Sequence, residues 1–322
     1  MHSDLVGQTE GRIVIESAFR HPAEEATAFV RRHIAAAGMP PPRWAVILGS
    51  GMGEVARRVD PVVRLSYADI PHFRDVAVAG HRGELILGHY AAAPVVVMSG
   101  RYHFYEGHPV AAMTLPVSVM ANLGADRLVV SNAAGGVNPR YRVGDLVLID
   151  DLICTWRGFG LNVAPEIDAP ESGAPESGAP ESDAPEGVAS DDDPTPMTSP
   201  GTRRRGRLLD HRLIVSAQRH AASLGFAMTT GCYHATTGPT YETRAEYRMM
   251  RKLGIDLVGM STAAEVLHAA LVCRMRVLAL SMVSNVANVD RPSVTSHDEV
   301  VDAGRIAAGR VERLMERLVG GG

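Results

Sequence analysis

Short apolar segments alternate with segments of helical periodicity along most of this chain, and this alternation constrains the fold more than any other feature. The predicted strands cover residues 44–48, 84–87, 95–98, 127–130, 145–149, 256–258 and 276–283, and the predicted helices cover 23–36, 110–123, 212–224, 243–253, 263–270 and 297–318. Strands that alternate with helices favour an α/β fold in which helices cover a buried sheet. Such folds bind ligands where strands end, and glycine-rich or polar loops follow several of these strands.

The composition excludes several classes of function. The chain has 322 residues and a formal net charge of −4, so it lacks the basic field with which proteins attract nucleic acid or anionic membranes. Its apolar runs are too short to span a bilayer, and its N-terminus, with Asp4 and Glu10, does not resemble a signal peptide. Cys154, Cys232 and Cys273 match neither a disulfide framework nor a zinc site, so we expect reduced thiols and a cytoplasmic protein.

Two residue types limit the chemistry of a site. Lys252 is the only lysine, so an anion site would depend on arginine and backbone N–H groups unless Lys252 itself takes part. The thirteen histidines include no pair at helical i, i+4 spacing around a glutamate, the pattern that binds zinc. We therefore expect no metal ion.

A five-residue repeat interrupts the pattern between residues 163 and 207. The motif Ala-Pro-Glu-Ser begins at residues 169, 174 and 179, and a shorter Ala-Pro-Glu begins at 184. Dense proline and glutamate without apolar residues cannot offset the entropy lost on ordering. We therefore predict one domain over residues 1–322 that contains a disordered, low-complexity insertion at 163–207. A tolerated surface insertion is the simpler interpretation, and a lid or partner-binding tail beside a site is the alternative.

The segment Gly49-Ser50-Gly51-Met52-Gly53 follows the first predicted strand and precedes a predicted helical turn at 54–59. Glycines let the backbone approach an anion, and a helix N-terminus favours negative charge. Glu54 stands where the dinucleotide fingerprint needs a glycine, and its carboxylate would oppose a pyrophosphate. A nicotinamide-dependent dehydrogenase is therefore the poorer interpretation, whereas a phosphate loop and a tight turn without ligand both stay open.

Arg101, His103 and Tyr105 directly follow the strand predicted at 95–98. In an extended stretch these three side chains alternate onto one face. Arginine offers a fork of donors to phosphate oxygens, histidine adds another, and tyrosine supplies a hydroxyl beside a flat apolar surface. A surface arginine beside buried histidine and tyrosine is the structural alternative, but three such groups on one face favour a ligand site.

Two further segments suit a planar heterocycle. Small residues at 131–139 would let a ring or an anion lie against the backbone, or would serve close strand packing. Tyr241 could stack on a ring while Glu242 accepts its N–H groups. The alternative for the second segment is a helix start, with Thr240 or Thr243 as the cap and Glu242 in the first turn.

Polar residues also follow the last two predicted strands. Ser261 or Thr262 either lies in a polar loop or caps the next helix, with Glu265 completing a capping box. The amide of Asn285 both donates and accepts, which is the pairing that N7–H and O6 of a purine need. His297 begins the last predicted helix, where capping is the simpler role.

Together these segments resemble the trimeric purine nucleoside phosphorylase family. The resemblance is collinear from about Ile47 to Ala303, apart from the insertion, and its motifs lie at residues 101–107, 132–139, 238–246 and 259–265. It implies the nucleoside phosphorylase fold, with a central mixed, partly barrel-like sheet surrounded by helices. It also implies a homotrimer that uses inorganic phosphate as a co-substrate and needs no cofactor.

The resemblance also implies a role for each matching residue. Phosphate ligands are implied at Ser50, His81, Arg101, His103, the backbone of Ala133, and Ser261. Ribose contacts are implied at Tyr105, Met260 and His297, and base contacts at Tyr241, Glu242 and Asn285. Of these, we expect Asn285, Glu242 and His103 to act in catalysis.

The implied reaction is phosphorolysis of inosine, guanosine and their 2′-deoxy forms to the free base and (deoxy)ribose 1-phosphate, a step of purine salvage. Sugar and base separate through an oxocarbenium-like transition state. Asn285 at N7 and Glu242 at N1–H would stabilise and orient the departing purine, while phosphate attacks the sugar carbon. Adenosine mismatches this pair because it lacks N1–H and carries a donor at position 6.

One segment departs from the family pattern. The family contributes a phenylalanine to the neighbouring subunit's ribose pocket from the segment after the strand at 145–149. The insertion rewrites this segment here, and its single phenylalanine, Phe159, has no assigned role.

Three alternatives remain open. They are a nucleoside-binding protein of weak activity on the same fold, a 5′-methylthioadenosine phosphorylase, and the dehydrogenase discussed above. The sister group that acts on methylthioadenosine differs at the positions of Glu242 and Asn285, which disfavours it. The sequence does not rank guanosine, inosine and xanthosine.

Overall fold

The structure is a computed structural model, and it describes residues 21–76, 82–155, 208–287 and 297–320. The insertion at 163–207, His81 and Phe159 lie outside the described residues, as does the side chain of His297.

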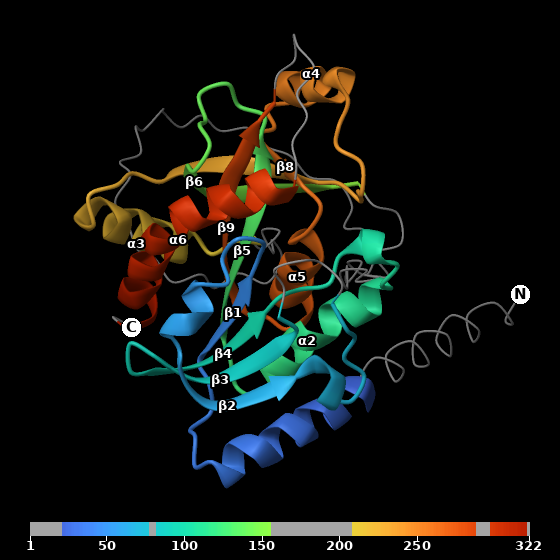
Figure 1. Cartoon of the computed structure of the whole chain (residues 1–322), viewed down its shortest axis with the longest axis vertical. Coiled ribbons are helices and arrows are strands. Elements are labelled where there is room, and N and C mark those ends of the chain that lie inside the picture. The colour runs from blue at the N-terminus through green and yellow to red at the C-terminus, as the bar shows by residue number, and fades with distance from the viewer. Residues whose placement is uncertain (1–20, 77–81, 156–207, 288–296, 321–322) are drawn as a thin grey trace, which may run out of the picture. The chain divides into compact units, whose positions relative to one another are not determined.

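Nine strands within the described residues form one mixed sheet, in the order β2-β3-β4-β1-β5-β8-β7-β6-β9 (Figure 1). The strands are β1 (Trp44–Leu48), β2 (Asp60–Ser66), β3 (Glu84–Tyr90), β4 (Ala93–Ser99), β5 (Arg127–Gly136), β6 (Leu146–Cys154), β7 (Thr229–Ala235), β8 (Leu257–Gly259) and β9 (Arg276–Val286). Because β5 also pairs with β9, the strands β5, β8, β7, β6 and β9 close into a ring. The prediction of a mixed, partly barrel-like sheet is therefore confirmed.

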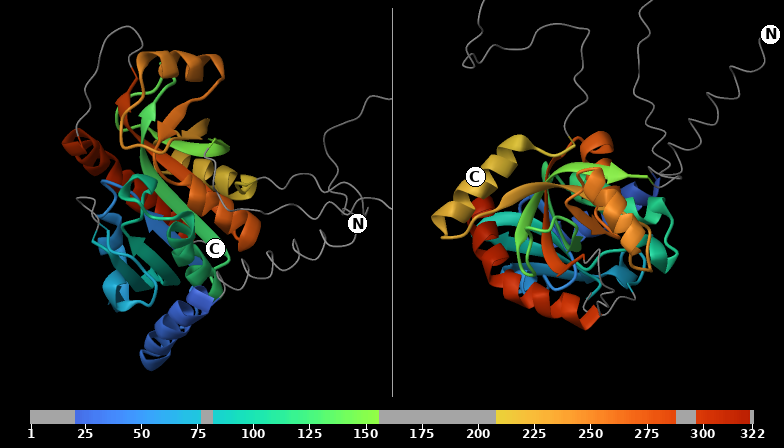
Figure 2. Two further views of the ribbon diagram at one scale, coloured as in Figure 1. Left: turned by 90° about the vertical axis from the view of Figure 1, so that its right-hand side faces the viewer. Right: turned by 90° about the horizontal axis from the view of Figure 1, so that it is seen from above.

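Helices pack on both sides of this sheet. They are a helix over residues 21–36, α2 (Val110–Asn122), α3 (His211–Ser223), α4 (Arg244–Lys252), α5 (Ala263–Leu267) and α6 (His297–Gly320). α6 packs against β9 and α3, whereas α2 packs against α5. In the left view of Figure 2, α6 and α5 lie on opposite sides of the long strand β5. No helix in the described ranges is long and apolar enough to cross a membrane.

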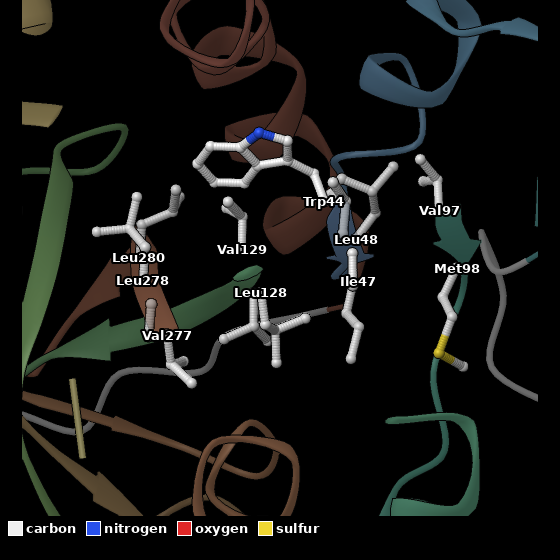
Figure 3. Packing of buried hydrophobic residues seen from close by; sticks show 14 of the residues in the cluster. Trp44, Ile47, Leu48, Val97, Met98, Leu128, Val129, Val277, Leu278 and Leu280 are labelled. Atoms are coloured by element: carbon white, nitrogen blue, oxygen red, sulfur yellow. The ribbon is translucent and has the colours of Figure 1, made fainter. Parts of the chain in front are cut away.

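The core is centred on the parallel strands β4, β1, β5 and β9. Trp44, Val129 and Leu278 project to one side of these strands, and Leu128 and Val277 project to the other (Figure 3). All five side chains are buried, with at most 3% of their surface exposed. Apolar residues on both faces of parallel strands require cover on both faces, which the two groups of helices provide.

Helix α3 illustrates how local sequence fixes an element. Leu213, Ile214, Ala217 and Ala221 recur at helical spacing and are all buried. The carboxylate of Asp210 accepts a hydrogen bond from the backbone N–H of Leu213 at 3.0 Å, which satisfies a donor in the first turn.

The structure corrects three predictions of local structure. β5 does not end at residue 130 but continues to Gly136, because residues 131–136 pair with β9 and the last two also pair with β8. Strands β2 and β7 were not predicted. Residues 104–106 form a 3-10 turn, so the stretch after β4 is not extended throughout.

A π-helical turn, His268–Val272, follows α5 and buries a histidine. Nε2 of His268 lies 2.6 Å from Oγ of Ser118 on α2, and only 8% of His268 is exposed. Burial lowers the pKa of His268 from its usual value to about 4. The buried imidazole is therefore neutral at physiological pH.

His268 makes the free energy of unfolding depend on pH. The unfolded chain binds a proton near pH 6.5 and the folded chain only near pH 4, so stability is complete above pH 6.5 and falls as pH drops towards 4. The full effect is on the order of 3 kcal/mol. We expect His268→Gln to flatten this dependence in urea unfolding at pH 7.0, 5.5 and 4.5. Exposed His33→Gln is the control, and an unchanged slope in His268→Gln would contradict the assignment.

Candidate active site

A pocket opens where β1, β5, β8 and β9 end. The described residues that were predicted as site residues all line this pocket: Ser50, Arg101, His103, Tyr105, Ala133, Tyr241, Glu242, Met260, Ser261 and Asn285. The remaining two, His81 and the side chain of His297, lie outside the described residues. The chain thus brings together groups from segments that are more than 200 residues apart in sequence.

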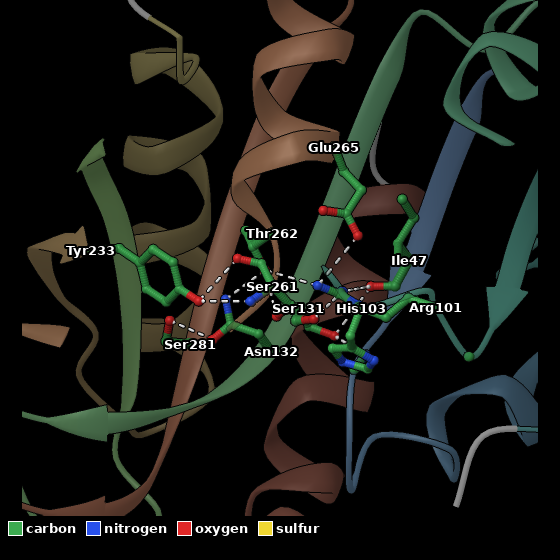
Figure 4. A network of polar contacts seen from close by, with 12 residues as sticks. Ile47, Arg101, His103, Ser131, Asn132, Tyr233, Ser261, Thr262, Glu265 and Ser281 are labelled. Atoms are coloured by element: carbon green, nitrogen blue, oxygen red, sulfur yellow. Dashed lines mark hydrogen bonds and ion pairs between the residues drawn. The ribbon is translucent and has the colours of Figure 1, made fainter. Parts of the chain in front are cut away.

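Arg101 is a buried cation at one end of the pocket, with 1% of its surface exposed (Figure 4). Its Nη1 donates to Oγ1 of Thr262 at 2.8 Å, and its Nη2 donates to the carbonyl of Ser131 at 2.5 Å. Oε1 of Glu265, itself buried, lies 3.7 Å from Nη1. A guanidinium held by fixed acceptors in a buried setting keeps one orientation, so this end of the pocket can bind an anion.

Thr262 connects Arg101 to the neighbouring polar groups. Its Oγ1 also accepts from Nδ2 of Asn132 at 2.8 Å, and Oδ1 of Asn132 accepts from Ser281 at 2.8 Å. Two obligate donors thus occupy Oγ1 of Thr262, so its own hydrogen is directed to Oγ of Ser261, 3.3 Å away. Ser261 lines the pocket and keeps its own hydrogen to donate there.

The backbone of Thr262 is strained. Its φ is +76°, a value that β-branched residues rarely adopt and that costs of order 1–3 kcal/mol. The side chain makes no capping bond to α5, and Glu265 is buried beside Arg101, so of the two alternatives for this segment the structure favours the polar loop over the capping box. Strain of this kind persists where surrounding contacts fix the residue, and here those contacts are the bonds to Arg101 and Asn132.

His103 and Tyr105 form one wall of the pocket. Their rings stack with centroids 4.9 Å apart. Nδ1 of His103 lies 2.8 Å from Oε1 of Glu106, and because a carboxylate only accepts, Nδ1 carries the hydrogen. Burial raises the pKa of Tyr105 to about 12, so its hydroxyl stays protonated and can donate.

Glu242 is held at the other end of the pocket. Thr236 donates to its Oε1 at 3.1 Å, and Tyr247 donates to its Oε2 at 3.2 Å. The cap of α4 is instead Thr243, whose Oγ1 accepts from the N–H of Glu246 at 3.2 Å within a capping box. Glu242 is therefore not needed to start the helix, and its carboxylate is available as a hydrogen-bond acceptor in the pocket.

Asn285 faces Gly135 across the same end of the pocket. Oγ of Ser284 donates to Oδ1 of Asn285 at 3.0 Å and lies 3.2 Å from the carbonyl of Ala134. A carbonyl oxygen has two lone pairs, so Oδ1 can accept a second hydrogen bond. A Cβ at Gly135 would lie 3.3 Å from Val258 and 3.5 Å from Nδ2 of Asn285, so glycine keeps this surface flat enough for a ring.

Gly49, in the loop after β1, lies against the backbone of β5. A Cβ at Gly49 would lie 2.6 Å from the carbonyl of Ser131 and 2.8 Å from Cα of Asn132. Glycine is thus required for close packing of β1 on β5. The turn that follows, Val55–Arg58, is a single 3-10 turn, so the loop does not lead into the N-terminus of an α-helix. Ser50 nevertheless lines the pocket.

Several side chains that line the pocket or hold its residues in place were not found by sequence reasoning. Thr262 and Glu265 were considered only as caps, and Glu106, Thr236 and Tyr247 were not singled out. The contact between Glu106 and His103 could have been predicted, because the two residues are three positions apart in sequence. The role of Tyr247 could not, because its spacing in sequence is that of an ordinary buried residue of an amphipathic helix. Within the described ranges, no three His, Cys, Asp or Glu side chains are placed to hold a metal ion.

Comparison with known proteins shows the family of this chain. The phosphorylase superfamily matches residues 43–320, and the purine nucleoside phosphorylase 1 of Bacillus subtilis is 38% identical over 302 residues, which cover 92% of this chain and 97% of that protein. The chain belongs to the purine nucleoside phosphorylase family. A bovine purine nucleoside phosphorylase is 35% identical over 289 residues, covering 86% of this chain and 88% of the relative.

Solved structures of purine nucleoside phosphorylases share the fold. A Schistosoma mansoni purine nucleoside phosphorylase in complex with adenosine superimposes with a TM-score of 0.73 at 32% identity, covering 92% of this chain and 96% of that one. A schistosome enzyme with hypoxanthine gives the same TM-score at 31% identity, with the same coverage of both chains.

Close packing at Gly49 predicts a stability effect. We expect Gly49→Ala to destabilise the protein by about 1–3 kcal/mol, because the new methyl group meets backbone atoms that cannot rotate away. Gly53→Ala is the matched control in the same loop, since a Cβ there meets nothing within 4 Å. Thermal unfolding measures both variants, and equal melting temperatures would refute the packing role of Gly49.

Proposed function

We propose that this chain is a purine nucleoside phosphorylase, a pentosyltransferase that cleaves the N-glycosidic bond of guanosine, inosine and their 2′-deoxy forms. Inorganic phosphate is the co-substrate, no other cofactor takes part, and the products are the free base and (deoxy)ribose 1-phosphate. The observation that carries the proposal is a single pocket that the buried guanidinium of Arg101, the carboxylate of Glu242 and the amide of Asn285 all line.

Phosphate binds at the Arg101 end. Arg101 supplies a fixed positive charge, and Ser261 supplies a hydroxyl whose hydrogen faces the pocket because Thr262 occupies its oxygen. Ser50, His103 and Ala133, which line the pocket, complete this group. By likeness to the family, we assign His81 to the same group. Support comes from the burial of Arg101, since a desolvated cation attracts an anion more strongly than an exposed one.

The nucleoside occupies the rest of the pocket. Tyr105, Met260 and His297 contact the ribose, and the half-exposed ring of Tyr241 stacks on the base. Glu242 accepts from N1–H of the purine, and Asn285 pairs with N7 and O6. Thr236 and Tyr247 each occupy one lone pair of the carboxylate, so both oxygens keep a lone pair with which to accept from the substrate.

The reaction exchanges one bond at the sugar carbon for another. A phosphate oxygen forms a bond to C1′ as the bond from C1′ to N9 breaks, and the bonding electron pair stays with the purine. Asn285 hydrogen-bonds at N7 and stabilises the negative charge that the base acquires as it departs. The departing base then takes up a proton from the solvent. Catalysis depends on positioning and electrostatics, with Asn285, Glu242 and His103 as the catalytic residues and no covalent enzyme intermediate.

Assembly, compartment and domain organisation belong to the same proposal. We infer a homotrimer by likeness to the family, in the cytoplasm, where cysteine thiols stay reduced. The family match over residues 43–320 supports a single domain, while the insertion at 163–207 stays a sequence prediction.

A phosphate-dependence assay tests the proposed reaction. We expect purified protein to release base from inosine and guanosine only when phosphate is present, and not from adenosine. Asn285→Ala should lower kcat/KM by about a hundredfold or more, as expected when a group that stabilises transition-state charge is lost. Asn122→Ala, an exposed asparagine at the end of α2, is the control.

Three outcomes would redirect the proposal. Release of adenine from methylthioadenosine would indicate the sister activity. Nucleoside binding without release would indicate a binding protein, and release without phosphate would indicate a hydrolase.

Thr262 should act as a positioning residue for the phosphate end. Thr262→Val keeps the branched shape but removes the acceptor of Arg101, so we expect KM for phosphate to rise about ten- to hundredfold while KM for the nucleoside changes little. Thr262→Ser retains the hydroxyl and should stay close to wild type. Steady-state kinetics with either substrate varied separates the two constants, and a rise confined to the nucleoside KM would contradict this role.

A further inference from the structure

Tyr247 contacts Glu242 and, like it, lines the pocket. It matches none of the site residues implied by the resemblance. It lies on α4 and is 6% exposed, and its ring packs among Val137, Met250 and Val258. Its hydroxyl donates to Oε2 of Glu242 at 3.2 Å. Burial raises the pKa of Tyr247, so the phenol stays neutral and keeps this hydrogen.

The hydrogen-bond capacity of this wall follows from that contact. A phenol has one hydrogen and two lone pairs, and the hydrogen of Tyr247 is used on Glu242. What Tyr247 can offer a ligand is therefore an acceptor. Glu242 also offers only acceptors, and Thr236 fixes its second oxygen from the other side. The wall made by Glu242 and Tyr247 thus presents acceptors to the pocket and no donor.

We infer that Tyr247 makes this site selective for 2-amino-6-oxopurine nucleosides. Guanine carries three N–H donors at positions 1 and 2. N1–H and the adjacent hydrogen of the 2-amino group match the two carboxylate oxygens, and the second amino hydrogen, on the N3 side, matches the oxygen of Tyr247. Hypoxanthine has only N1–H on this edge. Xanthine places a carbonyl oxygen at position 2, against a wall of acceptors. The affinity of the site therefore falls from guanosine to inosine to xanthosine.

This inference rests on the proposed function, but its test does not need turnover. Without phosphate the nucleosides bind and are not cleaved, so calorimetry gives the dissociation constants of guanosine, inosine and xanthosine. We expect wild-type full-length protein to bind guanosine most tightly and xanthosine most weakly. Tyr247→Phe keeps the packed ring and removes the hydroxyl, and should lower the preference for guanosine over inosine about fivefold, the effect of one hydrogen bond.

Thr236→Val is the matched control. It removes the other donor to Glu242 without removing an acceptor from the pocket, because Thr236 does not line it. We expect Thr236→Val to weaken the binding of guanosine and inosine equally, so that the ratio of their dissociation constants stays within about twofold of the wild-type ratio. A purely structural role of Tyr247 would give the same pattern in Tyr247→Phe.

The outcomes distinguish a failure of the role of Tyr247 from a failure of the proposed phosphorylase activity. An equal loss of affinity for guanosine and inosine in Tyr247→Phe would overturn the role of Tyr247. Tighter binding of inosine than of guanosine by the wild type would overturn it as well. Selective binding followed by no base release when phosphate is added would leave that role standing and overturn the phosphorylase proposal. Thermal unfolding of each variant confirms that the compared proteins are folded.

Discussion

A buried guanidinium organises this molecule. Arg101 lies near the end of β1 and beside the middle of β5, and removing a cation from water is costly unless neighbouring dipoles and charges replace the solvent. Backbone carbonyls, a strained threonine and a buried carboxylate do so here (Figure 4). Each of these groups comes from a different element, so the sheet, the turn before α5 and the stretch after β4 must all be in place before the charge is satisfied.

The strand arrangement explains why the charge lies there. β4, β1, β5 and β9 run parallel, so their carboxyl ends share one edge, where folds of this class bind their ligands. Gly49 lets β1 approach β5 closely at this edge, and β5 continues past its apolar half to deliver Asn132 and Gly135 to the pocket. The same strand is thus core in its first half and site wall in its second.

That division also explains which features the sequence could predict. Apolar periodicity located β1, β4, α2 and α3 because burial selects those side chains locally. It missed the second half of β5, since residues 131–136 are small or polar and their strand conformation depends on pairing with β9. The resemblance to the family identified the residues that line the pocket. It could not predict the directions of their hydrogen bonds, because these depend on contacts that Thr262 and Tyr247 make with residues from other elements.

The two ends of the pocket differ in a way that suits the proposed reaction. The Arg101 end is cationic and attracts the nucleophile, whereas the Glu242 end carries a formal negative charge beside a base that becomes negative as it departs. A carboxylate without hydrogen-bond donors there would oppose the transition state by charge repulsion. Thr236 and Tyr247 each donate to one of its oxygens, which disperses that charge, and N1–H of the purine adds a third donor. Glu242 therefore orients the purine at a reduced electrostatic cost, and the cost would fall further for a base that brings an additional N–H to the same wall.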